Sequence, residues 1–587
     1  MVNLSKKVKR KKRLEIVDWI FLVCFGLIFL RLAFLQVKQA PELKQEARQK
    51  NFKVISQPAP RGAIYDREGR LLAVSIPYYD LFAESKNIKE APAVVAGKLA
   101  PIINESPEKL IANFSSGKGF WLKRRLPYED YIAIKKLAIE GIVFEEIFVR
   151  SFPEAKIASH VIGLVNTDGK GLEGIEKQYN YLLSGRAGKI SILKDGKQNL
   201  IPSLNKGVSA QPGQDLFLTI DIKVQRILEE EIEKVFKEYS ARGAVGIVLD
   251  ADNGEVLALA NRPNYDPNPP VTSSLDCRRN RSVTDIFEPG SVFKMVTAAA
   301  GLEERVVKPE DNFFCENGKY FVQNHTIHDT HPYGMLTFRE IIVKSSNIGT
   351  VKVAAKFGKE RMYKYAVAFG FGKKTGIDLP GEVSGKLRPV SRWSDYSMTA
   401  IPFGQEVSAT VLQCAAAVGV IVNGGNLYQP YFLKGVRDSC GRFIPGPKPV
   451  PVRRVISQAT SDTLISILVD VASEEGTAQW AAIPGYRVGG KTGTAQKVEN
   501  GRYSRSKYVA SFSGFIKSPA RNLVIYVMVD EPKGASYYGG IVAGPAFNRI
   551  GQRTLLALGI PPDQPVNGEN KNLNDVIPAR SKRESKH

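Results

Sequence analysis

Three short motifs follow one another along the 587-residue chain, and their order constrains its fold more than any other feature. They lie at residues 291–294 (SVFK), 345–347 (SSN) and 491–494 (KTGT). No motif is informative alone, because the serine-to-lysine spacing recurs at 191–194 and a second K-T-G lies in a glycine- and proline-bearing loop at 374–376. Together they predict a fold that brings a nucleophile, a base and an anion-binding strand into one acyl-transfer site.

The first motif lies in a segment that predicts a buried helix. A Pro-Gly turn at 289–290 precedes Ser291, and the residues up to Leu302 are almost all apolar or small. Ser291 then occupies the first helical turn, where free N–H groups favour a developing anion, and Lys294 shares its face. Burial would lower the pKa of this lysine, and a neutral amine beside a hydroxyl is a general base beside a nucleophile. The alternative is a lysine that reaches solvent at a helix start, which is commoner for an isolated S-x-x-K.

The second motif lies between two predicted helices. Thr337 and Glu340 have the spacing of a capping box that opens the first helix, which places Ser345 and Asn347 on an interhelical loop. There a hydroxyl can relay protons between nucleophile, lysine and leaving group, and an amide can hold substrate. The tripeptide alone is more typical of a helix terminus, so its significance depends on the other motifs.

The third motif predicts a strand. It precedes a strand-like segment at 508–516, which indicates an antiparallel pair. Lys491 supplies positive charge, and the hydroxyls of Thr492 and Thr494 can bind a carboxylate. Gly493 would allow a ligand backbone to approach closely, and a strand N–H is available as an oxyanion donor.

With these motifs the chain resembles the penicillin-recognising serine acyltransferases, which carry S-x-x-K, S-x-N and K-T-G. Ser346 stands where many relatives carry aspartate, a position at which the family pattern tolerates variation. The resemblance extends toward the N-terminus. Segments 61–69, 150–163 and 171–176 are similar to the N-terminal module of class B penicillin-binding proteins, and segments 218–221 and 288–291 are similar to the start of their transpeptidase domain.

The resemblance implies a peptidoglycan D,D-transpeptidase that cross-links stem peptides through an acyl-enzyme and binds β-lactams covalently. The implied catalytic residues are Ser291 (nucleophile), Lys294 (base), Ser345 (proton shuttle), Asn347 (donor binding) and Lys491. The implied substrate-binding residues are Thr492, Gly493 and Thr494, which with Lys491 would bind the terminal carboxylate. The backbone N–H groups of Ser291 and Thr494 would form the oxyanion hole, and no metal or organic cofactor would be needed.

The N-terminus predicts a membrane anchor. Residues 1–15 are basic, whereas residues 16–37 are almost entirely apolar and interrupted by Arg31. The positive-inside rule then places everything beyond Lys38 on the outer, periplasmic side of the cytoplasmic membrane. A cleaved signal peptide is the alternative, but no small-x-small cleavage pattern follows promptly.

The predicted organisation is that of a multidomain α+β protein. Its parts are a cytoplasmic segment (1–15), a transmembrane helix (16–37), a β-rich pedestal (45–210), a transpeptidase domain (211–556) and a disordered tail (557–587). In the transpeptidase domain we expect an antiparallel sheet covered by helices. The strands expected there include 243–249 and 523–530, and the helices include 222–239 and 410–422.

The net charge of +23 does not indicate nucleic acid, because no nucleic-acid motif accompanies it and the basic residues are dispersed. Anionic lipid and wall polymer outside the membrane fit it better. The cysteines and histidines lack metal-ligand spacing, and the cluster of His325, His328 and His331 indicates a polar loop beside the active site. A disulfide between Cys277 and Cys315 is possible, but the sequence does not decide it.

The resemblance favours the division-specific type of class B protein, through a compact pedestal and the run 165–169 that leads to Glu173. The N-terminal module does not resemble a glycosyltransferase, so a membrane glycosyltransferase and division proteins would be partners. The alternatives are an elongation-type transpeptidase, a D,D-carboxypeptidase or β-lactamase, and a non-catalytic β-lactam sensor or scaffold. We find no carboxylate motif for a deacylating water, and the cytoplasmic segment is too short for a sensor's effector.

Overall fold

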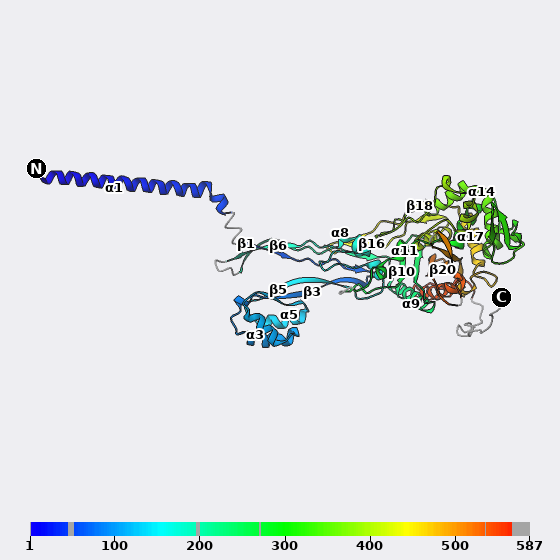
Figure 1. The fold of residues 1–587 in the computed structure, drawn as a ribbon, viewed down its shortest axis with the longest axis horizontal. Helices are drawn as coiled ribbons and strands as arrows, with labels where there is room; N and C mark the ends of the chain where they lie inside the picture. The colour runs from blue at the N-terminus through cyan, green and yellow to red at the C-terminus, as the bar shows by residue number, and fades with distance from the viewer. Residues whose placement is uncertain are drawn as a thin grey trace.

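The computed structural model describes residues 2–44, 52–194, 200–268, 272–499, 501–534 and 536–565. Its N-terminal helix α1 (Val2–Ala33) continues into a π-helical turn, η1 (Phe34–Lys38). Within the described residues, the stretch Glu15–Lys38 is long and apolar enough to cross a membrane, with a mean hydropathy of 2.4 and no burial against the rest of the protein. In Figure 1 this helix lies at one end of an elongated molecule.

The pedestal consists of two β arms and a helical lobe (Figure 1). One arm is an antiparallel sheet in the order β1-β6-β7, and in the other arm the long strand β3 pairs with β4 and β5. The strands are β1 (Phe52–Gln57), β3 (Leu71–Ala83), β4 (Phe120–Leu126), β5 (Ile142–Ser151), β6 (Gly188–Lys194) and β7 (Leu200–Val208).

A helical lobe accompanies the strands of the predicted β-rich pedestal. It contains α3 (Pro92–Ile103), α4 (Pro107–Ser115) and α5 (Tyr128–Lys136) around a hydrophobic core of its own. Helices α3 and α4 both carry proline in the first turn, where its missing N–H does no harm. The Ser106 hydroxyl also caps α4 by accepting from Lys109 N at 3.3 Å. These start signals are present in the sequence, and the prediction overlooked them.

One sheet joins the pedestal to the catalytic domain. Its strand order is β17-β16-β8-β2-β3-β4. The strands not yet described are β2 (Ile64–Tyr65), β8 (Asp215–Leu218), β16 (Leu433–Arg437) and β17 (Phe443–Pro445). At this junction the buried carboxylate of Glu176 accepts from Arg61 Nε at 2.5 Å and from Arg150 Nε at 2.7 Å. Strands from both sides of the predicted domain boundary at residue 210 share this sheet, so the position of that boundary stays a prediction.

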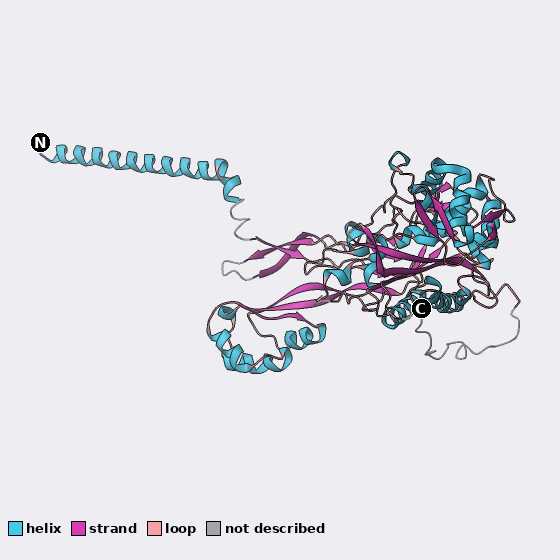
Figure 2. Ribbon diagram, turned by 45° about the vertical axis from the view of Figure 1, so that its right-hand side comes forward, coloured by secondary structure: helices cyan, strands magenta, loops and turns pink. Residues whose placement is uncertain are grey.

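The catalytic domain is built on a five-stranded antiparallel sheet with the order β10-β9-β21-β20-β19. The strands are β9 (Gly243–Asp250), β10 (Val256–Arg262), β19 (Arg487–Glu499), β20 (Arg502–Lys517) and β21 (Leu523–Asp530). Every residue of β9 and β10 is buried, which requires cover on both faces. Figure 2 shows the strands in magenta with cyan helices on either side.

Helices cover both faces of this sheet, as predicted. Gly246 of β9 lies against Leu228 of α9 (Ile222–Glu238), whereas Leu249, which points to the opposite face, lies beside α16 (Val411–Val422). Helix α19 (Gly544–Ala557) packs against α9, and α17 (Gln458–Asp470) packs against α16. Asp221 caps α9, and a capping box opens α16. The predicted tail, 557–587, starts one position too early, because Ala557 still belongs to α19, and its residues 566–587 lie outside the described residues.

The elements that hold the first two motifs pack against this sandwich. They are η3 (Gly290–Phe293), α12 (Lys294–Glu303), α13 (Phe338–Val343), α14 (Asn347–Ala368) and the strands β11 (Asn312–Phe314), β12 (Lys319–Val322), β13 (His325–His328) and β14 (Met335–Thr337). The capping box of Thr337 and Glu340 is confirmed. Asn347 is the first residue of α14, so the prediction that it lies on the loop is wrong by one position.

Candidate active site

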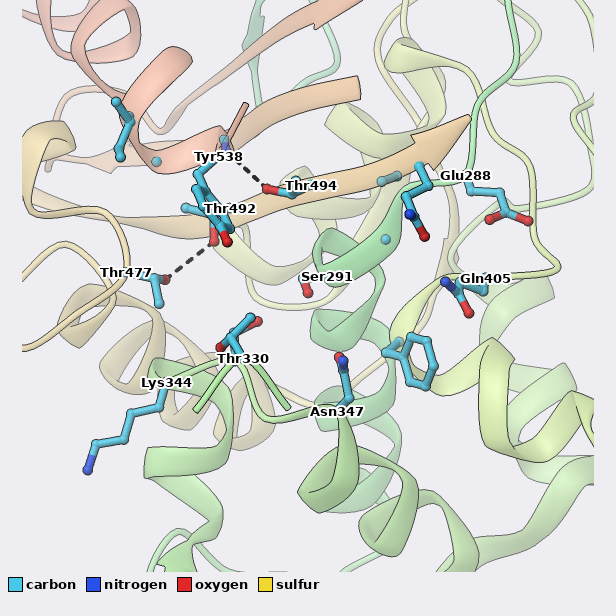
Figure 3. A pocket seen from close by; sticks show the side chains of 18 of the residues that line it. Glu288, Ser291, Thr330, Lys344, Asn347, Gln405, Thr477, Thr492, Thr494 and Tyr538 are labelled. Carbon is cyan, nitrogen blue, oxygen red and sulfur yellow. Dashed lines mark hydrogen bonds between the residues drawn. The ribbon is translucent and has the colours of Figure 1, made fainter. Parts of the chain in front are cut away.

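The three motifs meet at one cleft of about 470 Å³ (Figure 3). The predicted residues that line it are Ser291, Ser345, Asn347, Thr492 and Thr494. Lys294 and Lys491 are both fully buried behind the wall of the cleft, and Gly493 is buried beside them. The second K-T-G, at 374–376, lies outside helices and strands and does not line the cleft.

Ser291 lies in the single turn of 3-10 helix that leads into α12. The turn begins at Gly290, whose φ of 53° is in the left-handed region and whose N–H donates to Gly404 O at 3.2 Å. The chain then becomes α-helical at Lys294, one turn after the serine. The serine therefore lies at a helix start, as the sequence predicts, and faces the cleft.

Lys294 connects the first motif to the second. Its ammonium nitrogen Nζ donates to Ser345 O at 2.5 Å and to Ser345 Oγ at 3.2 Å. Burial, and secondly the nearby charge of Lys491, hold the pKa of Lys294 well below its usual value. A lysine in this state can accept a proton from a hydroxyl in the cleft.

Lys491 approaches the same region from strand β19. Its side chain is fully buried, and burial lowers its pKa to about 7. Its Nζ lies 3.5 Å from Thr492 Oγ1. Two lysines with lowered pKa values thus lie behind the wall of the cleft that Ser291 lines.

Gly493 lies where strand β19 meets η3. A Cβ atom at this position would lie 2.4 Å from Ser511 Oγ, 3.0 Å from Val292 Cγ2 and 3.2 Å from Pro289 O. The space is therefore taken by the protein itself, and glycine allows β19 to pack against η3. Glycine is thus required here for the packing of this chain, and the substrate-binding role of Gly493 stays a prediction.

The second motif is held by Asp329, a residue that the sequence analysis missed. Its carboxylate accepts from Asn347 N at 2.5 Å, from Ile348 N at 3.1 Å and from Ser346 Oγ at 2.6 Å. An anion at the N-terminus of α14 is favoured by the free N–H groups and the helix dipole. The side chain of Asn347 donates to His328 O at 2.9 Å.

The opposite wall comes from β19 and the segment before α18 (Gly539–Val542). Thr494 Oγ1 accepts from Gly539 N at 3.0 Å, and Thr492 Oγ1 lies 3.4 Å from Thr477 Oγ1. Hydroxyls therefore gather at one side of the cleft in Figure 3. They suit a carboxylate or another anion.

Several other lining residues carry no motif signal. They are Glu288, Thr330, His331, Lys344, Phe403, Gln405, Thr477, Ala495, Gln496 and Tyr538. Of the histidine cluster, His331 lines the cleft as predicted, whereas His325 and His328 lie on strand β13 and not on a loop. Within the described residues, no three His, Cys, Asp or Glu side chains are grouped to hold a metal ion, and Cys277 and Cys315 are free thiols. A serine one turn before a buried lysine of lowered pKa, with hydroxyls on the facing strand, is an arrangement suited to covalent acyl transfer.

Comparisons with known proteins agree with this arrangement. The family model of the penicillin-binding protein transpeptidase domain matches residues 244–552, and that of the penicillin-binding protein dimerisation domain matches residues 56–218. The chain therefore belongs to the class B penicillin-binding proteins, and the predicted fold class and enzyme class are confirmed.

Two curated relatives and one solved structure illustrate the similarity. A probable peptidoglycan D,D-transpeptidase PenA of Neisseria gonorrhoeae is 35% identical over 96% of each chain. Peptidoglycan D,D-transpeptidase FtsI of Escherichia coli is 32% identical over 97% of each chain. Penicillin-binding protein 3 of Mycobacterium tuberculosis, complexed with aztreonam, is 27% identical with a TM-score of 0.67, covering 88% of this chain and 99% of that one.

Proposed function

We propose that the protein is a membrane-anchored serine D,D-transpeptidase that cross-links peptidoglycan stem peptides during septal wall synthesis. The observation that supports this best is the buried amine of Lys294, which lies 3.2 Å from Ser345 Oγ at the cleft that Ser291 lines. Relatives of almost the same length are named peptidoglycan D,D-transpeptidases, which supports the choice of substrate.

In the proposed reaction, Ser291 Oγ attacks the penultimate D-Ala carbonyl while its proton passes to neutral Lys294. The backbone N–H groups of Ser291 and Thr494 would stabilise the oxyanion, since fixed donors cost no reorganisation at that moment. The C–N bond breaks, Ser345 relays the proton to the leaving amine, and D-Ala departs. Lys491, Thr492 and Thr494 would hold its carboxylate, and Asn347 would hold the donor stem.

In the second half, an amine on a neighbouring stem attacks the ester carbonyl. A new C–N bond forms and the bond to Ser291 Oγ breaks. The proton that the attacking amine loses passes through Lys294 to the serine oxygen. A β-lactam would acylate Ser291 by the first half alone, which accords with the aztreonam complex of the mycobacterial relative.

The septal role and the topology are parts of the same proposal. The septal role is supported by the run 165–169 leading to Glu173, which resembles that of the division-specific type, and by the FtsI relative. An elongation role is the alternative. The basic N-terminus and apolar helix support an anchor with the catalytic domain on the periplasmic side, where a membrane glycosyltransferase and division proteins would be partners.

The test is covalent labelling with fluorescent penicillin. We expect Ser291→Ala to abolish the label and Ser504→Ala to retain it. Ser504 has the same spacing to Lys507, but it lies on β20, where its Oγ accepts from Lys507 N at 3.3 Å. Labelling of Ser291→Ala would contradict the assignment.

The same protein then separates transferase from hydrolase. If no side chain acts as a general base on water, the penicilloyl ester should persist for many minutes. General-base catalysis typically raises the rate of such a step by roughly 10²–10⁴-fold. A donor thioester with a D-amino acid acceptor should give more aminolysis than hydrolysis. Rapid turnover of penicillin would favour a carboxypeptidase or β-lactamase.

A further inference from the structure

A carboxylate lies at one side of the catalytic cleft, and the proposed chemistry does not use it. Glu288 lines the cleft three residues before Ser291. In Figure 3, Glu288 and Gln405 lie on one side of Ser291, while Thr477 and Lys344 lie on the other. The two sides of the cleft therefore differ in chemistry.

The Glu288 carboxylate is fixed by neutral donors. Its Oε1 accepts from Glu406 N at 2.9 Å and from the Tyr503 hydroxyl at 3.4 Å. Burial, and secondarily the charge of Glu406, raise the pKa of the Glu288 carboxyl. No lysine or arginine of the described part of the chain forms an ion pair with it, whereas Glu406 is paired with Arg388 at 2.5 Å. The negative charge of Glu406 is therefore neutralised by Arg388, whereas no cationic side chain of the described residues neutralises the charge of Glu288.

A half-buried, oriented carboxylate without a counter-ion is suited to a cation supplied by a ligand. The cleft already provides the hydroxyls of Thr492 and Thr494 for a carboxylate on the side of β19, and the buried Lys491 lies behind them. A peptide that carries both a carboxylate and a primary ammonium group would therefore be aligned by charge across Ser291. Stem peptides with a diamino acid have both groups.

We propose that Glu288 binds a primary ammonium group of the stem-peptide substrate and makes the enzyme selective for stems that carry it. This inference rests on the proposed transpeptidase function. The ammonium can belong to the donor stem or to the acceptor stem, whose amine loses its proton before it attacks, and the chemistry of recognition is the same for both.

The donor arm of the test compares thioester donors whose side-chain amine is free or N-acetylated, using the full-length protein in detergent. The wild type should favour the free amine in kcat/KM by roughly tenfold, the usual size of a hydrogen bond to a charged group. In Glu288→Gln the ratio should approach one. Glutamine keeps an acceptor for Glu406 N and removes only the charge. Glu406→Gln is the matched control and should keep the wild-type ratio, since its side chain is paired with Arg388.

The acceptor arm keeps the acetylated donor fixed and varies the acceptor amine. If the acceptor supplies the ammonium, its KM should rise roughly tenfold in Glu288→Gln while the donor ratio stays constant. Collapse of the donor ratio assigns the ammonium to the donor. An equal loss of kcat/KM for both donors with unchanged acceptor KM would indicate a structural role and would overturn the inference, as would wild-type values in both arms. Failure of the proposed function is a separate result, in which Ser291→Ala and the wild type form product equally.

Discussion

At the scale of single residues, the site depends on two lysines that the fold forces toward neutrality. Lys294 and Lys491 are completely buried, and burial is the largest influence that lowers the pKa of each. A cation removed from water in this way destabilises the fold unless it is paired or loses its proton. The same burial that destabilises the ammonium makes the amine a usable base.

Lys294→Met tests this coupling of stability and chemistry. We expect penicillin acylation to fall by roughly 10²–10⁴-fold, since the general base is lost. Between the lowered folded pKa and the usual value of 10.5, the unfolded chain binds more protons than the folded protein. Wild-type stability should therefore rise with pH in this window, relative to the variant, by up to about 1.4 kcal/mol per pH unit.

The measurement is thermal unfolding of wild type and variant at pH 7 and pH 9, together with labelling rates. Lys359→Met, which removes an exposed lysine, is the control and should change neither the labelling nor the pH dependence. A stability difference between Lys294→Met and wild type that is independent of pH would mean that Lys294 is charged in the folded protein.

At the scale of elements, the contact of β19 with η3 positions the third motif beside the first. Gly493→Ala should break this contact, because its Cβ would lie 3.0 Å from Val292 Cγ2 of η3, besides 2.4 Å from Ser511 Oγ of β20. We expect a loss of about 1–3 kcal/mol of stability and a large loss of penicillin labelling, as the strand moves away from Ser291.

Gly97→Ala provides the matched comparison. Gly97 lies within α3, and nothing lies within 4 Å of its Cβ position. Alanine there should stabilise the protein by up to about 1 kcal/mol without changing labelling. Wild-type labelling by Gly493→Ala would show that the approach of β19 to η3 is not needed for acylation.

Sequence patterns predicted the elements whose signals are local. Strand β21 begins and ends where expected, at Leu523 and Asp530, because its apolar run is bounded by polar residues. The capping box at Thr337 likewise locates α13. Asp329 was missed because its partners, 17–19 positions further along the chain, meet it only when β13 folds back onto α14. The sheet that spans the junction was missed for the same reason, since β8 pairs with β2 and β16 across long stretches of sequence.

At the scale of the whole molecule, the apolar helix and the catalytic domain lie at opposite ends of an elongated chain, with the pedestal between them (Figure 1). Glu176 and its two arginines, Arg61 and Arg150, tie the pedestal segments together with little solvent exposure. The joining sheet then links the pedestal to the catalytic domain.

This arrangement is productive only if the catalytic domain lies outside the cytoplasm, which gives the last prediction. A reporter that is active only outside the cytoplasm, fused after His587, should be active, because the basic N-terminal segment stays inside and one helix crosses the membrane. The same reporter fused before Met1 should be inactive. As a control, replacing the basic residues of segment 1–15 by neutral ones should weaken this asymmetry, since the charge difference sets the orientation. An active N-terminal fusion with an inactive C-terminal fusion would place Ser291 in the cytoplasm, out of reach of any cross-linkable wall, and would contradict the proposed function even if penicillin labelling were normal in detergent.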